Sequence, residues 1–230
     1  MTVGHTDLHE LTSSELALIP SAERKREFGS ARRRQQYLCG RSLLRRMLQD
    51  RTGKPGISHQ LTTTENGKPV CINGPAISIT HSGDRVVCCV AEEGDIGIDL
   101  EVIDEERDIS KVATRFFSDA ERSWLGTQSK DRFFMLWVLK EAYIKAVGRS
   151  IFGGMNSLRC KVEPPYIDTL SMGDRMNDLC LYIADDSFLA IATTEASLAI
   201  VEFERWDPDT GRLTSNGEYH LLATTSKSED

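Results

Sequence analysis

Residues 95–101 read DIGIDLE, a stretch in which apolar and polar side chains alternate. A period of two predicts a β-strand whose Ile98 and Leu100 face the core of the protein. Asp99 and Glu101 then share the opposite face, about 7 Å apart, so that both carboxylates can reach one cation. The alternative interpretation is an ordinary solvent-exposed strand face.

A long amphipathic helix is predicted over residues 132–147, with Gly148 as its C-terminal stop. Within this helix Trp137, Glu141 and Lys145 are spaced four residues apart and lie on one stripe. Glu141 and Lys145 alone would form a surface ion pair worth about 0.3 to 0.5 kcal/mol. The strand and the helix are both rich in Ile, Leu, Phe and Trp, however, so we expect both to pack against other elements.

Three carboxylates are thus presented without a nearby His or Cys ligand pattern: those of Asp99, Glu101 and Glu141. Oxygen ligands favour a hard cation, and Mg²⁺ usually shares its protein site with substrate phosphates. The sequence therefore favours an enzyme that acts on a phosphate ester or a pyrophosphate.

The segment THSG, residues 80–83, follows a predicted strand and offers a hydroxyl, an imidazole and exposed backbone groups to phosphate oxygens. The alternative is a histidine at the end of a turn with no ligand.

The order of the predicted elements indicates an α+β protein made of two similar halves that form a pseudo-dimer. The first half, residues 1–105, is expected to hold a basic helix over about 21–50 and a β-hairpin within 84–101. Leu38, Leu43, Leu44, Met47 and Leu48 would form the apolar stripe of that helix, with arginines on its other faces.

The second half, residues 106–206, is expected to hold helices over 109–148 and three later strands. Ser118 followed by Glu121 predicts a capping box at one helix start. Residues 207–230 mix Pro, Gly, Ser and Thr with few apolar side chains, so they are expected to form a flexible tail.

The formal net charge of -7 on 230 residues argues against wholesale nucleic-acid binding. Residues 24–51 are nevertheless rich in arginine, which suits a small anion or an acidic partner. A solvated helix face is the alternative explanation for this basic segment.

The six cysteines show no CxxC spacing and are expected to be reduced core residues. The chain has neither a signal-like N-terminal segment nor an apolar run of about 18 residues. A cytoplasmic protein without membrane contact is the resulting expectation.

Several motifs together resemble those of the Sfp-type 4'-phosphopantetheinyl transferases, in the holo-acyl-carrier-protein synthase superfamily. The resemblance runs from about Ser21 to Gly148, and each motif alone is weak, whereas HSG, GID-x-E and W-x-x-KE-x-x-x-K together are specific. The motifs are NGKP (66–69), ISITHSGDRVVCCVA (77–91), GIDLE (97–101), RFFSDAE (115–121) and FFMLWVLKEAYIKAVG (133–148).

This resemblance implies transfer of the phosphopantetheine arm of coenzyme A to a serine of an apo acyl, peptidyl or aryl carrier protein, releasing adenosine 3',5'-bisphosphate. It implies that Asp99, Glu101 and Glu141 bind Mg²⁺, which they would share with the coenzyme A pyrophosphate. Lys145 would contact the phosphates and could protonate the leaving group, and Glu141 would also be a candidate base for the serine proton.

The same resemblance implies a set of coenzyme-binding residues. His81 and Ser82 would hold the pyrophosphate and the 3'-phosphate, and the loop with Lys68 and Pro69 would touch the adenine end. For the 3'-phosphate the candidates, which the sequence does not rank, are Arg26, Arg33 and Arg34. Trp137 would pack beneath the metal site.

Two other functions fit the same carboxylates. One is a Mg²⁺-dependent hydrolase of a nucleotide or pyrophosphate, and the other is a catalytically inactive relative that still binds carrier proteins. The segment FGGMNSL, residues 152–158, departs from the family pattern at the rim of the carrier site. The length of two halves suggests a monomer with an internal pseudo-twofold.

Overall fold

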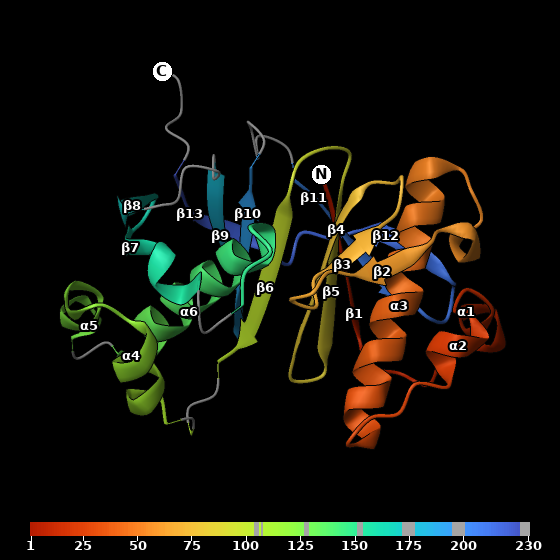
Figure 1. The fold of residues 1–230 in the computed structure, drawn as a ribbon, viewed down its shortest axis with the longest axis horizontal. Helices are drawn as coiled ribbons and strands as arrows, with labels where there is room; N and C mark the ends of the chain where they lie inside the picture. Colours follow the sequence, from red (N-terminus) through yellow and green to blue (C-terminus); the bar gives the residue numbers. More distant parts are fainter. Residues whose placement is uncertain are drawn as a thin grey trace. The chain divides into compact units, whose positions relative to one another are not determined.

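The computed structural model describes residues 1–103, 106, 108–126, 129–150, 154–171, 178–194 and 201–225. The chain divides into two compact units, Met1–Glu93 with Ile200–Gly217, and Gly94–Ala199 with Glu218–Asp230. In each unit a long helix packs on a β-sheet (Figure 1). The α+β class predicted from the sequence is therefore confirmed.

The first unit is built on a five-stranded sheet with the order β12-β11-β1-β5-β4 and a separate two-stranded β2-β3 ribbon. Its strands are β1 (Thr2–Asp7), β2 (Leu61–Thr63), β3 (Pro69–Cys71), β4 (Ala76–Ser82), β5 (Arg85–Ala91), β11 (Glu202–Asp207) and β12 (Arg212–Ser215). Its helices are α1 (Ser13–Ala17), α2 (Ser21–Arg24), α3 (Ala31–Thr52) and the 3-10 turn η1 (Gly56–Ser58).

Helix α3 covers the sheet of the first unit through the apolar stripe predicted from the sequence. Leu43, Leu44, Met47 and Leu48 are buried in one cluster with side chains from β3, β4, β5 and β11. The helix starts later than predicted, because Ser30 caps it by accepting a hydrogen bond from the backbone of Arg33. It ends at Gly53, whose positive φ of 70° suits glycine.

The second unit is built on a six-stranded sheet with the order β6-β10-β9-β13-β8-β7. Its strands are β6 (Ile96–Val102), β7 (Arg159–Glu163), β8 (Tyr166–Ser171), β9 (Asp178–Ala184), β10 (Ser187–Thr193) and β13 (His220–Thr224). Its helices are α4 (Ser110–Phe116), α5 (Asp119–Leu125), α6 (Ser129–Ala146) and the 3-10 turn η2 (Met155–Ser157). The predicted capping box of Ser118 and Glu121 opens α5.

The two units share a common arrangement of one strand, one long helix and one hairpin, although their sheets differ in the remaining strands. In the first, β1 precedes α3 and pairs antiparallel with β5, which pairs antiparallel with β4. In the second, β6 precedes α6 and pairs antiparallel with β10, which pairs antiparallel with β9. A strand, a long helix and a hairpin thus occur twice in the same order and pairing, as expected for two similar halves. The pseudo-twofold arrangement of the halves stays a prediction.

The predicted hairpin within residues 84–101 is wrong. Strand β5 forms its hairpin with β4, whereas β6 lies in the other sheet and pairs along its whole length with β10. The alternation of side chains identified both strands correctly, but it carries no information about which strand pairs with which. The first segment of the first unit therefore ends at Glu93, before DIGIDLE, rather than at residue 105, and the unit has a second segment at Ile200–Gly217.

The expected flexible tail over residues 207–230 is also wrong for its described part. Strand β12 pairs with β11, and β13 lies between β9 and β8. Strand β11, which was expected to follow β10 in the second half, pairs in parallel with β1 of the first unit. Residues 226–230, at the end of the predicted tail, lie outside the described residues.

All six cysteines lie in the described part, and each is a buried free thiol, as expected. Burial raises the pKa of Cys89 and of Cys160 to about 12, which keeps these thiols protonated. In the described ranges no helix combines the length and the apolar character that a membrane span requires.

Candidate active site

The predicted carboxylate strand and the predicted helix lie directly against one another. Strand β6 packs under the last turns of α6, and Gly97 marks the closest approach. A Cβ atom on Gly97 would lie 2.0 Å from the carbonyl oxygen of Ala142 and 2.4 Å from the backbone nitrogen of Ala146. Because alternate strand residues share a face, Asp99 and Glu101 lie on the face that carries Gly97, toward α6.

Lys145 of α6 contacts Asp99 of β6. Its Nζ atom lies 2.5 Å from Oδ1 of Asp99 and 3.1 Å from the carbonyl oxygen of Ile98. The Asp99 side chain is 8% exposed and the Lys145 side chain is 28% exposed, so the carboxylate is buried while the ammonium keeps a route to solvent. Asp99 is thus positioned to hold a cation and holds an ammonium ion here.

The other two predicted carboxylates come from the same two elements. Glu101 is half-buried, one strand period beyond Asp99, and Glu141 is buried one helical turn before Lys145. Within the described ranges, no three His, Cys, Asp or Glu side chains are gathered closely enough to hold a metal ion. The donor set fits Mg²⁺ by its chemistry, since it is all oxygen and Asp99 already holds a cation.

Aromatic and charged groups fix α6 in place. Trp137 stacks on Phe133 with ring centroids 5.9 Å apart and an interplanar angle of 12°, and it meets Phe116 edge-on. Lys140 is fully buried, and its ammonium lies 2.9 Å from Oε1 of Glu121. The predicted structural role of Trp137 thus has a direct basis in this packing.

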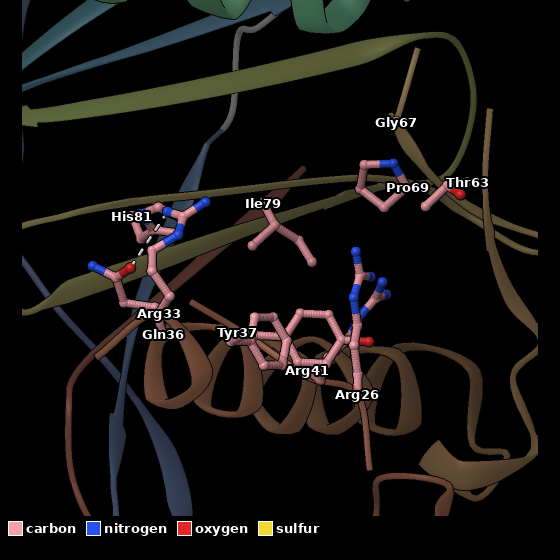
Figure 2. A pocket seen from close by; sticks show the side chains of 11 residues that line it. Arg26, Arg33, Gln36, Tyr37, Arg41, Thr63, Gly67, Pro69, Ile79 and His81 are labelled. Carbon is pink, nitrogen blue, oxygen red and sulfur yellow. Dashed lines mark hydrogen bonds between the residues drawn. The ribbon is translucent and has the colours of Figure 1, made fainter. Parts of the chain in front are cut away.

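The first unit holds a pocket of about 350 Å³ between α3, the segment before it, β2, β3 and β4. Figure 2 shows the side chains of the pocket, with arginines on the α3 side and Pro69 and Thr63 opposite. The lining residues are Arg26, Phe28, Arg33, Gln36, Tyr37, Arg41, Thr63, Gly67, Pro69, Ile79 and His81. Three guanidinium groups around one pocket form a site for a strongly anionic ligand.

Arg33 and His81 contact one another at one end of the pocket (Figure 2). The Nη1 atom of Arg33 lies 2.8 Å from Nε2 of His81. A guanidinium group only donates hydrogen bonds, so Nε2 of His81 accepts in this contact and carries no proton there.

Arg41 is held by Glu23 and by Tyr37. Its Nε lies 3.4 Å from Oε2 of Glu23, and its guanidinium lies 5.1 Å from the centroid of the Tyr37 ring. The Nη1 atom of Arg41 is buried, and within the described part of the chain no hydrogen-bond partner reaches it. A buried hydrogen-bond donor without an acceptor is unfavourable in free energy unless a bound ligand accepts its hydrogen bond.

Glu23 forms ion pairs with two arginines of α3. Its other oxygen lies 2.5 Å from Nη2 of Arg45, which is 1% exposed and also donates to the carbonyl oxygens of Gly56 and His59. The alternative explanation of the basic segment, a solvated helix face, therefore does not hold for Arg41 and Arg45, which are buried.

The pocket gathers only some of the coenzyme-binding candidates. Arg26, Arg33, Pro69 and His81 line it, whereas Arg34, Lys68 and Ser82 are not among its lining residues in the described ranges. Arg34 instead donates to the carbonyl oxygen of Arg24, at 3.4 Å. Lys68 and Ser82 are half-buried beside lining residues, in the β2-β3 turn and at the end of β4.

Sequence reasoning missed Gln36, Tyr37 and Arg41 as pocket residues. Their signal is helical spacing from Arg33, because positions i+3, i+4 and i+8 share one face of α3. The sequence left a ligand-binding face and a solvated face both open here, since nothing in the sequence near α3 shows that β2, β3 and β4 cover it.

The sequence profile described as the 4'-phosphopantetheinyl transferase superfamily matches residues 95–201. These residues include β6 and α6, the two elements that bring Asp99 and Lys145 together. Residues 95–201 therefore belong to the 4'-phosphopantetheinyl transferase superfamily, and the resemblance found in the motifs is confirmed.

Several individual proteins to which the chain is similar are named 4'-phosphopantetheinyl transferases. The chain is 36% identical to a 4'-phosphopantetheinyl transferase of Bacillus pumilus, over 67% of this chain and 66% of the relative. It is 36% identical to one of Aneurinibacillus migulanus, over 52% and 51%, and 32% identical to one of Nostoc sp., over 61% and 61%. The matched region thus spans between half and two thirds of the length of these relatives.

Proposed function

We propose that this protein transfers the 4'-phosphopantetheine arm of coenzyme A to a serine of an apo carrier protein, in a Mg²⁺-dependent reaction that releases adenosine 3',5'-bisphosphate. The observation that carries the proposal is the contact between Lys145 and Asp99. It joins the GID-x-E strand and the KE-x-x-x-K helix, which both lie inside the family match.

Asp99, Glu101 and Glu141 are the proposed ligands of Mg²⁺. When bound, the ion would offset negative charge that develops on pyrophosphate oxygens during attack by the serine hydroxyl. Lys145 is proposed to direct its ammonium at the same phosphates and to donate a proton to the leaving group. Glu141 is also proposed to receive the serine proton, although a metal-bound carboxylate is a weak base.

The arginine pocket of the first unit is proposed to hold the anionic nucleotide end of coenzyme A. Arg33 and Arg41 would donate charge-assisted hydrogen bonds to a phosphate, which would complete the buried Nη1 of Arg41. Pro69 and the aromatic rings of Phe28 and Tyr37 supply apolar surface for a flat base. His81 would contribute a further donor once Arg33 turns to the ligand, and Ser82 and Lys68 would act from the adjoining backbone.

The experiment that tests this function combines purified protein, Mg²⁺, coenzyme A and a panel of apo carrier proteins, followed by intact mass measurement. We expect the carrier to gain the mass of one phosphopantetheine arm, only with Mg²⁺ present. Cleavage of coenzyme A without a labelled carrier would support the hydrolase instead. Carrier binding without any product would support the inactive relative.

A further inference from the structure

Asp99 is a buried carboxylate whose charge is offset by the ammonium of Lys145. Nζ of Lys145 is 2.5 Å from Oδ1 of Asp99, and it donates a second hydrogen bond to the carbonyl oxygen of Ile98. A carboxylate that is 8% exposed is unfavourable without a compensating cation. The lysine therefore stabilises the site in the state that the structure describes.

The backbone fixes the position of the Lys145 main chain, whereas the ammonium group at the end of its side chain can move. The close approach at Gly97 sets the distance between β6 and the last turns of α6. Lys145 reaches Asp99 from that turn through a flexible side chain that remains 28% exposed. The ammonium can thus leave Asp99 for solvent or for a phosphate without any movement of the helix.

A divalent ion and an ammonium group repel one another at the distance of a shared carboxylate. We propose that Lys145 is a resident cation on Asp99 that the divalent metal must displace. The inference rests on the proposed function, in which Asp99 is a ligand of Mg²⁺. Metal binding then has a second consequence, because it releases the Lys145 ammonium, which can turn to the phosphates of coenzyme A.

Metal affinity tests the displacement without using activity. Mn²⁺ binding, measured by electron paramagnetic resonance or calorimetry without coenzyme A, is compared between the wild type and Lys145→Gln. The amide keeps a hydrogen-bond donor beside Asp99 but removes the competing charge. We expect Mn²⁺ to bind Lys145→Gln about tenfold more tightly, as expected when one unit charge a few ångströms away is removed.

Lys130→Gln is the matched control, since it removes the same charge near the other end of α6, about 22 Å away. Its Mn²⁺ affinity should equal that of the wild type. Equal affinity in Lys145→Gln and the wild type would overturn the displacement and leave the transferase proposal intact. Absence of Mn²⁺ binding in every protein would also overturn the displacement, whereas the transferase proposal is tested separately by carrier labelling in the presence of coenzyme A.

Chemical labelling of amines gives a second readout in the unmodified protein. An acylating reagent followed by peptide mass spectrometry reports the reactivity of each lysine. We expect the reactivity of Lys145 to rise severalfold at saturating Mn²⁺ as the ammonium leaves Asp99, while Lys130 stays unchanged. Unchanged labelling of Lys145 at saturating metal would overturn the proposal.

Discussion

The Nζ atom of Lys140 lies 2.9 Å from Oε1 of Glu121, and neither side chain is exposed to solvent. The ammonium also donates to the carbonyl oxygens of Met155 and Leu158, so α5, α6 and the segment before β7 meet at one charged group. Glu121 in turn caps α5 through Ser118. This buried pair holds the helix that carries Glu141 and Lys145.

Lys140→Met is therefore expected to destabilise the second unit by about 3 kcal/mol, because it leaves the Glu121 carboxylate buried without its cation. Urea unfolding monitored by circular dichroism measures the change. The double variant Lys140→Met/Glu121→Gln should recover part of the loss, since no buried charge remains. Lys111→Met, on the exposed face of α4, is the control and should change little. A small effect of Lys140→Met would show that the pair is not a structural anchor.

Gly97→Ala is expected to loosen the contact between β6 and α6. The added Cβ would collide with backbone atoms of Ala142 and Ala146, which lie in the last turns of α6 and shift only at a cost of about 1 to 3 kcal/mol. We expect a lower thermal midpoint and loss of carrier labelling, because Asp99 and Lys145 would separate.

Gly29→Ala is the matched control for this substitution, since a Cβ there would meet nothing within 4 Å. It should keep both the thermal midpoint and the labelling activity. If Gly97→Ala behaved like Gly29→Ala, the close approach of the helix would be irrelevant to the site.

The local features of the fold were predictable from the sequence. The alternation of Ile98 and Leu100 with Asp99 identified β6, and both apolar side chains are fully or almost fully buried. The stop at Gly148 and the capping box at Ser118 identified helix ends, because such ends depend on a few neighbouring residues.

The long-range pairings were not predictable. The partner of β6 is β10, about ninety residues away, and β11 returns two hundred residues along the chain to lie beside β1. The same limit applies to the site. The sequence does not decide whether Arg41 and Arg45 are solvated, because their burial depends on pairing with Glu23, which lies outside α3.

Arg33 and Arg34 are adjacent in the sequence but lie at different places relative to the pocket. Substituting each in turn therefore distinguishes an effect on ligand binding from a general effect of surface charge. Arg33 lines the pocket and Arg34 does not. Arg33→Gln should raise the KM for coenzyme A about tenfold or more and change kcat little, because it removes a charge-assisted hydrogen bond worth about 1.5 to 3 kcal/mol.

Arg34→Gln removes the same charge from the next position and should leave KM within about twofold of the wild type, as for a screened surface charge. Dephospho-coenzyme A, which lacks the 3'-phosphate, identifies the group that is bound. The substitution Arg33→Gln should change the KM for dephospho-coenzyme A less than it changes the KM for coenzyme A. Equal effects of the two substitutions would mean that the pocket is not the phosphate site.

Asp99→Ala and Glu141→Ala are each expected to abolish transfer, with a fall of about 100-fold or more, because each removes a proposed metal ligand. Both variants are expected to remain folded; in Asp99→Ala, Lys145 is partly exposed and can reach solvent when its partner is lost. Intact mass of the carrier measures transfer, and a thermal melt checks folding. Asp95→Asn, at an exposed position just before the strand, is the control. Full carrier labelling by either alanine variant would remove that residue from the metal site.

His9 and Glu15 link stability of the first unit to pH. Nε2 of His9 lies 2.8 Å from Oε1 of the buried Glu15, which also accepts a hydrogen bond from Nε1 of Trp206 at the same distance. The hydrogen bond to Glu15 raises the pKa of His9 despite its burial. Burial opposes ionisation of Glu15, but hydrogen bonds from His9 and Thr12 outweigh it and lower its pKa to about 2.

The signs of these two shifts define separate pH ranges. A raised histidine pKa gives stability that is complete below the ordinary value of 6.5 and is lost as pH rises through the raised value. A lowered glutamate pKa gives stability that is present above 4.5 and is lost as pH falls toward about 2.

His9→Gln should therefore destabilise the protein by about 1 to 2 kcal/mol near pH 5.5, and the difference from the wild type should shrink toward pH 9. Trp206 donates to the same carboxylate, so its fluorescence is a local reporter of unfolding in this unit. His220→Gln, at an exposed position, removes another imidazole and should show no such pH dependence. A difference between His9→Gln and the wild type that grew with rising pH would contradict the charged pair, since only the protonated imidazole is stabilised by Glu15.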